Sequence, residues 1–218
     1  MTLSVDAAVA RAEMVELQLR RRGIRDERVL EAMARVPRDR FVPDSLSAHA
    51  YDDGALPIGQ NQTISQPFVV ATICALLGLH GSERVLDVGT GSGYQAAVLA
   101  ELAAQVITIE RIPELAESAR AGLADAGYAN VEVVVGDGSL GVPERAPFDA
   151  VAVAAAAPTV PPALFDQLAE GGRLVVPRGS RFGQELVLVA RTAGGRTERT
   201  SIPCRFVPLV GDEGFGED

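Results

Sequence analysis

Cysteine and histidine are scarce in this sequence, and their scarcity limits the chemistry that it can support. The 218 residues contain two cysteines, Cys74 and Cys204, and two histidines, His49 and His80. The cysteines lie far apart and form no CxxC or other ligand spacing, and both histidines are isolated. We therefore expect reduced, structural thiols and no metal site.

Long apolar segments are also missing. No stretch approaches the roughly 18 consecutive apolar residues that a membrane-spanning helix needs. Residues 1–23 lack the continuous apolar core of a secretory signal. We therefore expect a cytoplasmic protein that does not enter a membrane.

Basic residues are outnumbered, with 20 Lys and Arg against 29 Asp and Glu, and the net charge is −9. This balance disfavours broad contact with nucleic-acid phosphates or anionic membranes, although a local basic patch is compatible with it. The length and the 47% hydrophobic content favour one domain with a large core. We expect a monomer with a helical cap and loop at 1–80, a ligand-binding core at 81–180, and strands and a tail at 181–218.

The most informative stretch is 84–110, RVLDVGTGSGYQAAVLAELAAQVITIE. The apolar run at 85–88 is typical of a buried parallel strand, and a glycine turn with Gly89, Gly91 and Gly93 follows it. A helical pattern to Ala103 and a second strand ending in Glu110 come next. Glycines allow close approach of a ligand, and a helix N-terminus favours an anionic group.

Two details argue against a dinucleotide as that ligand. The spacing is GxGxG rather than GxGxxG, and Asp87 stands where a carboxylate would face phosphates. S-adenosylmethionine fits better, because its ammonium suits Asp87, its carboxylate suits the helix N-terminus, and its ribose hydroxyls can donate to Glu110. An ordinary tight turn with solvated acids is the alternative interpretation.

A third acid follows the next predicted strand, at 131–135. Asp137 and Gly138 lie in Gly-Asp-Gly, and the carboxyl ends of parallel strands meet at one edge of a sheet. We expect Asp137 to converge with Asp87 and Glu110 and to reach the adenine. A simple turn explains the same sequence equally well.

The sequence before this core predicts two helices and a long connection. Residues 5–22 form an amphipathic pattern that ends in three arginines, and Asp26 caps a second helix that runs to Arg35. The arginines suit either an anion site or the C-terminus of a helix. Periodicity is lost at 41–62, which is typical of a functional or mobile loop.

An apolar helix is predicted at 68–79. Ser65 and Gln66 are both candidates for its cap, and Pro67 suits its first turn. The sequence therefore leaves two interpretations of Ser65 open, which are helix capping and chemistry.

The second half predicts a helix at 113–126, a strand at 148–153, a helix from Pro161 to Ala169, and a strand at 173–177. Strand-like runs at 184–191 and 199–210 flank the hairpin signal Ala193-Gly194-Gly195-Arg196. The acidic, glycine-rich tail at 211–218 is expected to be frayed. The predicted fold is a doubly wound, mostly parallel α/β sheet with an N-terminal helical cap and antiparallel C-terminal strands.

Six motifs appear in order: TISQP at 63–67, LDVGTGSGY at 86–94, GDG at 136–138, FDAVAVAAAAPTVPPALFDQL at 148–168, GGRLVVPRG at 171–179, and RFVPLVG at 205–211. By these motifs the chain resembles the protein-L-isoaspartate O-methyltransferase family over nearly its whole length. The glycine turn is shared with many enzymes that have the class I methyltransferase type of Rossmann-like sheet. TISQP, AAAP and RFVPL are specific to this family in combination.

The resemblance implies methylation of the free α-carboxylate of L-isoaspartyl residues in damaged proteins and peptides. S-adenosyl-L-methionine is then the donor and S-adenosyl-L-homocysteine the product, and the ester cyclises to a succinimide that allows repair. Ser65 occupies the position of the catalytic residue. The substrate-binding residues by this reasoning are Thr63, Ile64, Ala156, Val207, Pro208 and Leu209. The donor-binding residues are Asp87, Gly89, Thr90, Gly91, Gly93, Glu110, Arg111, Asp137 and Gly138.

The sequence departs from the family pattern at two positions. Asn61 stands where relatives tend to carry glycine, and Ala154 stands where threonine or glycine is common. Both changes affect the expected shape of loops more than the chemistry.

Three other functions fit the sequence less well. An enzyme that methylates an aspartate in a modified peptide to install an aspartimide would tend to carry more sequence after Val210. A non-catalytic module that binds S-adenosylmethionine would not need Ser65 or the small AAAP segment. The charge of −9 and the lack of an N/D-PP-Y motif disfavour methylation of nucleic acid.

Overall fold

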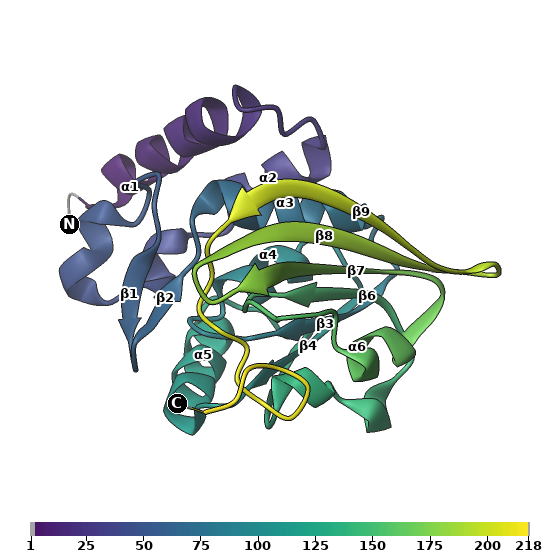
Figure 1. The fold of residues 1–218 in the computed structure, drawn as a ribbon. Helices are drawn as coiled ribbons and strands as arrows, with labels where there is room; N and C mark the ends of the chain where they lie inside the picture. Colours follow the sequence, from purple (N-terminus) through teal and green to yellow (C-terminus); the bar gives the residue numbers. More distant parts are fainter. Residues whose placement is uncertain (1–2, 218) are drawn as a thin grey trace.

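The computed structural model describes residues 3–217, and its centre is a seven-stranded sheet (Figure 1). The strand order is β5-β4-β3-β6-β7-β8-β9. The first five strands in this order are parallel, and β8 and β9 are antiparallel. The strands are β3 (Arg84–Val88), β4 (Gln105–Glu110), β5 (Val131–Val135), β6 (Phe148–Val153), β7 (Leu168–Ser180), β8 (Gly183–Thr192) and β9 (Gly195–Cys204).

The chain winds outward from β3 in two directions. It runs first through β4 and β5 on one side, and then returns to place β6 and β7 on the other side. A ligand crevice forms where the strand order reverses in this way, outside the carboxyl ends of the strands. The predicted doubly wound fold is therefore confirmed, and the reversal lies beside the glycine turn.

Both faces of the parallel strands are buried, which explains their continuous apolar runs. Val85 belongs to the hydrophobic cluster on one face and Leu86 to the cluster on the other, as the two-residue period of a strand requires. The helices that cover these faces are α3 (Pro67–Leu77), α4 (Tyr94–Ala100), α5 (Pro113–Asp125) and α6 (Pro162–Asp166). The helices predicted to end at Ala103 and Ala169 are shorter in the structure, where α4 and α6 end at Ala100 and Asp166. β7 begins at Leu168, five residues before the expected Arg173.

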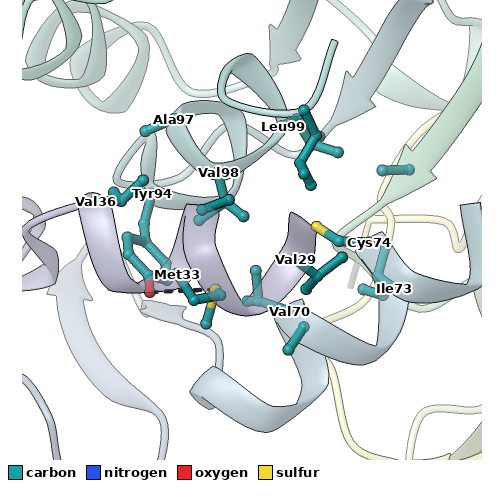
Figure 2. Packing of buried hydrophobic residues seen from close by; sticks show 14 of the residues in the cluster. Val29, Met33, Val36, Val70, Ile73, Cys74, Tyr94, Ala97, Val98 and Leu99 are labelled. Carbon is teal, nitrogen blue, oxygen red and sulfur yellow. Dashed lines mark hydrogen bonds between the residues drawn. The ribbon is translucent and has the colours of Figure 1, made fainter. Parts of the chain in front are cut away.

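Two N-terminal helical segments lie outside α3 (Figure 1). The first is α1 (Leu3–Glu13), which continues as a π-helical segment, η1 (Met14–Arg20), and the second is α2 (Glu27–Arg35). Asp26 caps α2 as predicted, since its Oδ1 accepts hydrogen bonds from two backbone N–H groups of the first turn. η1 and α2 pack against α3, and α2 also packs against α4; Figure 2 shows the side chains of α2 in this contact.

Buried side chains join α2, α3 and α4 into one packed layer (Figure 2). The Tyr94 hydroxyl donates a hydrogen bond to the Met33 sulfur at 3.6 Å, and the Phe41 ring meets Tyr94 edge to face. Cys74 is fully buried in this layer, and burial raises the pKa of its thiol. Cys74 is therefore a structural residue, as its isolation in the sequence predicts.

The three consecutive arginines at the C-terminal end of η1, Arg20 to Arg22, are engaged in ion pairs. Arg20 pairs with Glu27 at 2.5 Å, and Arg22 pairs with Asp53 at 3.0 Å while its guanidinium lies over the Phe68 ring. These contacts favour the structural interpretation of the arginines over an anion site.

The segment at 41–62 has more regular structure than the sequence predicts. It follows the 3₁₀ turn η2 (Arg38–Phe41), contains a second one, η3 (Asp44–His49), and leads into a hairpin of β1 (Leu56–Gly59) and β2 (Gln62–Ile64). At the hairpin turn Gln60 and Asn61 both have positive φ, at 51° and 56°. Asparagine tolerates this conformation better than most residues, which explains how it replaces the glycine expected there. The hairpin escaped sequence analysis because its turn lacks the usual Asn-Gly or Asp-Gly pair.

The two strands at the C-terminal edge form the predicted hairpin, but the second one ends earlier than expected. β9 stops at Cys204 instead of Val210. The following residues leave the sheet and pair with Ala156, which lies three residues after the end of β6: Ala156 N donates to Val207 O, and Leu209 N donates to Ala156 O. The 205–210 segment is thereby placed at the carboxyl ends of the parallel strands.

The tail at 211–217 is docked rather than frayed, which corrects the expectation; Asp218 lies outside the described residues. Asp212 N donates to Asp137 Oδ2 at 2.8 Å, and Glu213 N donates to Ser139 Oγ at 3.0 Å. Added Cβ atoms at Gly211 and Gly214 would overlap Asp137 and the Leu209 carbonyl. Gly211 and Gly214 therefore allow close packing of the tail, whereas the glycine content of the sequence suggested flexibility.

No helix in the described part of the chain combines the length and the apolar character needed to cross a membrane.

The hairpin turn generates a stability prediction. A left-handed backbone costs a residue with a Cβ roughly 1–2 kcal/mol, so Gln60→Gly should raise the free energy of unfolding by about 0.5–1 kcal/mol after the entropy of glycine is counted. Gln60→Val should lower it by at least about 1 kcal/mol, because a β-branched residue suits this conformation worst. Urea unfolding monitored by circular dichroism measures both changes, and a more stable valine variant would contradict the turn geometry.

Candidate functional site

A cleft lies at the carboxyl ends of β3 and β4. It encloses about 900 Å³, a volume that includes its open mouth. Twelve of the sixteen residues predicted for the site line it, namely Thr63, Ile64, Ser65, Gly89, Thr90, Gly91, Glu110, Arg111, Gly138, Val207, Pro208 and Leu209. The other four, Asp87, Gly93, Asp137 and Ala156, do not line it.

The glycine turn after β3 forms one wall of the cleft. Gly89, Gly91 and Gly93 all have positive φ, at 91°, 52° and 88°, which other residues adopt only with strain. A Cβ on Gly93 would also press on the Leu123 side chain at 3.2 Å. Gly93 therefore shapes the turn from behind, while Gly89 and Gly91 face the cleft.

Glu110 closes β4 beside this turn and is 6% exposed. Its Oε2 accepts a hydrogen bond from Gly91 N at 2.9 Å, and its Oε1 accepts one from Ile112 N at 3.0 Å. A carboxylate has about four acceptor positions, so each oxygen can accept a further hydrogen bond. Glu110 can therefore bind a pair of hydroxyl groups in the cleft.

Asp87 lies behind the cleft and is fully buried. Its Oδ1 accepts a hydrogen bond from Gln95 Nε2 at 2.8 Å, and its Oδ2 accepts one from the Thr108 hydroxyl at 2.9 Å. Burial raises the pKa of Asp87 to about 6, and these two hydrogen bonds offset part of the rise. Asp87 is connected to the cleft through two neighbours. Gln95 lines the cleft directly. Thr108 is hydrogen-bonded to Thr90, which also lines the cleft.

Asp137 faces the tail. Its Oδ1 accepts from both the backbone and the hydroxyl of Ser139, and its Oδ2 accepts from Asp212 N. Burial alone would raise the pKa of Asp137, but these hydrogen bonds outweigh it and lower the pKa. Asp137 lines a second hollow, bounded also by Phe215 and Arg111, and only the adjoining Gly138 lines the main cleft.

Ser65 lies between β2 and α3 and lines the same cleft as the glycine turn. The N-cap of α3 is Gln66, which makes no side-chain capping bond and instead donates to Asp53 Oδ1 at 2.7 Å. Within residues 3–217 the Ser65 hydroxyl has no hydrogen-bond partner. The capping interpretation of Ser65 is therefore wrong, and the hydroxyl is available to a ligand.

The third wall is apolar and comes from the C-terminal segment. Val207, Pro208 and Leu209 line the cleft because Ala156, in the segment that follows β6, pairs with them. Ala156 is itself completely buried, so it supports the wall from behind. Ala154 and Ala155 line the cleft next to it, and their small side chains keep it open.

Several residues that line the cleft are not indicated by the sequence. The most important are Tyr94 and Gln95, in the first turn of α4. Gln95 could have been noticed as the one polar side chain in the run YQAAVLA that follows the glycines. Its partnership with Asp87 could not, because it depends on the angle at which the helix leaves the turn.

Comparisons with known proteins agree with this architecture. The family model described as protein-L-isoaspartate(D-aspartate) O-methyltransferase matches residues 10–214. The chain belongs to the protein-L-isoaspartate O-methyltransferase family.

Individual relatives of this family match over most of their length. Protein-L-isoaspartate O-methyltransferase 2 of Marinobacter nauticus is 56% identical over 96% of this chain and 97% of its own. The protein-L-isoaspartate O-methyltransferase of Methanoculleus marisnigri is 54% identical over 94% and 93% of the two chains.

Two solved structures of the family have the same fold. One protein-L-isoaspartate O-methyltransferase superposes with a TM-score of 0.82 and 30% identity, covering 93% of this chain and 67% of that one. A Plasmodium falciparum member, crystallised with S-adenosyl-L-homocysteine, gives a TM-score of 0.80 and 26% identity over 92% and 98% of the two chains.

The buried Asp87 predicts a pH-dependent stability difference. Since the folded-state pKa is raised, the contribution of Asp87 to stability is fully present below about pH 4 and is lost as the pH rises through 6. Asp87→Asn is neutral throughout, so it should raise the free energy of unfolding of the ligand-free protein by about 3 kcal/mol at pH 8. The gain should shrink towards zero near pH 4.

Urea unfolding between pH 4 and pH 8 tests this, with the exposed residue change Asp125→Asn as the control that should alter little at any pH. A less stable Asp87→Asn variant at pH 8 would mean that the hydrogen bonds to Asp87 outweigh the cost of burying its charge.

Proposed function

We propose that this protein transfers a methyl group from S-adenosyl-L-methionine to the free α-carboxylate of L-isoaspartyl residues in damaged proteins and peptides. The single observation that carries the proposal is that one cleft is lined both by Ser65, whose hydroxyl has no hydrogen-bond partner among residues 3–217, and by the glycine turn with Glu110. Membership of the family, and the acceptor in its name, supply the substrate.

The cleft fits the donor. Glu110 has acceptor positions free for the two ribose hydroxyls, and the cleft also contains a buried acceptor without a partner, Gln95 Oε1, that suits a cation. Gly89 and Gly91 leave room for close approach of the ligand. We assign the donor to these residues with Thr90, Gly138 and Arg111, and give Asp87, Gly93 and Asp137 supporting positions behind them.

When bound, the donor supplies a methyl group on a positively charged sulfur. A carboxylate with an ordinary pKa near 4 is already ionised at neutral pH, so no general base is required from the protein. The chain must instead align the two reactants and keep water away, and alignment can contribute up to roughly 7–11 kcal/mol. Among residues 3–217 no histidine lines the cleft, which agrees with this demand.

Ser65 is proposed to hold the acceptor. Its hydroxyl donates one hydrogen bond to an oxygen of the substrate carboxylate and leaves the other oxygen directed at the methyl group. A neutral donor suits this task, because a cation at the same place would reduce the nucleophilicity of the carboxylate. Thr63 and Ile64, on β2, extend the same wall towards the substrate backbone.

The apolar wall is proposed to clamp the substrate backbone and exclude water. Val207, Pro208 and Leu209 face the cleft with mainly apolar surface, and their position is fixed by the backbone pairing with Ala156. Exclusion of water strengthens the hydrogen bond from Ser65 and protects the reacting groups.

The wider role proposed for the protein is repair. The methyl ester cyclises to a succinimide, whose hydrolysis returns some of the damaged residues to aspartate. We also propose that the protein works as a cytoplasmic monomer in which residues 1–218 form one domain.

Substitution of Ser65 separates the role of its wall from that of the glycine turn. Ser65→Ala should reduce kcat by roughly 10²-fold or more, because it removes a contact made to the reacting group. The dissociation constant of S-adenosyl-L-homocysteine should change less than about twofold. Ser92→Ala, at a serine in the glycine wall, is the matched control and should retain most of the rate.

Calorimetric binding and single-turnover transfer measure these two quantities. Equal loss of binding and transfer in Ser65→Ala would contradict the assignment, because it would indicate a general disturbance of the cleft.

The second prediction concerns the acceptor. Matched peptides that differ only in an isoaspartyl or aspartyl linkage are incubated with methyl-labelled donor, and base-labile methyl ester is counted. The isoaspartyl peptide should be methylated at least about 10²-fold faster in kcat/KM, since the cleft must discriminate by position of the carboxylate. Preference for the aspartyl peptide would overturn the repair function, and binding without transfer would indicate a non-catalytic module.

A further inference from the structure

The side-chain amide of Gln95 has half of its hydrogen-bonding capacity unused. Gln95 lies in the first turn of α4, is 6% exposed and lines the cleft. Its Nε2 donates to Asp87 Oδ1 at 2.8 Å, but its Oε1 is buried and makes no hydrogen bond within the described residues. A buried acceptor without a partner is costly, so it requires an explanation.

The orientation of this amide follows from Asp87. An ionised carboxylate only accepts hydrogen bonds, so the NH₂ group of Gln95 must point towards Asp87 and the oxygen away from it. Thr108 donates to the second oxygen of Asp87, which fixes the carboxylate on its other side. The network therefore leaves a carbonyl oxygen, and not an NH₂ group, as the unpaired end of this cleft-lining residue.

On the basis of the donor site proposed above, we propose that Gln95 Oε1 accepts a hydrogen bond from the α-ammonium group of S-adenosylmethionine. Asp87 acts through it as a positioning residue, although its place in the sequence suggested a direct contact. Gln95 is then a specificity-determining residue for the amino-acid end of the donor.

The ammonium is the group of the donor that fits this position best. The donor carboxylate only accepts hydrogen bonds, and Oε1 cannot donate one. The ribose hydroxyls are assigned to Glu110, whose carboxylate adjoins the glycine turn through Gly91 N. The ammonium is a strong donor and carries a positive charge, so the negative charge of Asp87 behind the amide also favours it.

The experiment compares two ligands that differ only in this group, S-adenosyl-L-homocysteine and its analogue without the α-amino group. The wild-type protein should bind the natural product roughly 10- to 100-fold more tightly than the analogue, as expected for a hydrogen bond to a charged group. Gln95→Met keeps the length of the side chain but removes the acceptor. It should lose most of this preference while its affinity for the analogue changes less than about twofold.

Asp87→Asn supplies a second variant that leaves Gln95 in place. An asparagine can accept from or donate to the amide, so Gln95 is no longer held in one orientation. The preference for the amino group should therefore fall in this variant too, by a smaller factor than in Gln95→Met. Unchanged preference in Asp87→Asn would overturn the positioning role of Asp87.

Gln167→Met is the matched control. Gln167 is also buried, at 7% exposure, but its amide bonds Val142 N and Leu140 O away from the cleft. This variant should keep the wild-type preference even if it is less stable. Isothermal titration calorimetry on the full chain measures all the dissociation constants, so the test does not depend on catalytic activity.

Two outcomes would overturn the proposal for Gln95. If Gln95→Met weakened both ligands equally, the side chain would serve packing alone, and if the preference persisted, the ammonium would bind elsewhere. Both outcomes leave the proposed methyl transfer intact. Failure of the wild-type protein to bind S-adenosyl-L-homocysteine would instead contradict the donor site itself.

Discussion

The buried carboxylate of Asp87 ties together the three elements that form the back of the cleft. It lies on β3, accepts a hydrogen bond from Thr108 on β4, and orients Gln95 on α4. The glycine turn is held between these contacts. Burial of this charge opposes folding at neutral pH. The network therefore lowers the stability of the fold, while it fixes the positions of the acceptors at the ligand site.

The cleft divides into two sides of different origin. The donor side is built from the carboxyl ends of the parallel strands, where the strand order reverses, and this arrangement is general to doubly wound sheets. The acceptor side is built from two segments far apart in the chain, the end of β2 with Ser65 and the 207–209 segment against Ala156. In the proposed function the first side binds the methyl donor, and the second selects the group that receives the methyl.

The sequence predicts the elements on the glycine-turn side of the cleft well because their signals are local. The glycines, Glu110 and the strands from β3 to β6 follow from short patterns, and each was placed within a few residues of its position in the structure. The same reasoning located Ser65 but left its role open. Its free hydroxyl became evident only when the structure showed that Gln66 is the N-cap.

The errors concern features that depend on distant contacts. The turn at Gln60 and Asn61 adopts positive φ without glycine, so no local signal marks the β1–β2 hairpin. The tail was expected to fray because it is rich in glycine and acid, but its N–H groups are bound by Asp137 and Ser139. The indirect position of Asp87 likewise depends on the packing of α4, which the period of its apolar residues does not specify.

The central claim is that one cleft holds the donor against Glu110 and the acceptor carboxylate against Ser65. The most direct measurement is a crystal structure with S-adenosyl-L-homocysteine and an isoaspartyl peptide bound together. The account predicts the ribose hydroxyls on Glu110, and one oxygen of the α-carboxylate on the Ser65 hydroxyl with the other facing the donor sulfur. A peptide carboxylate bound away from Ser65, or a ribose that makes no contact with Glu110, would contradict it.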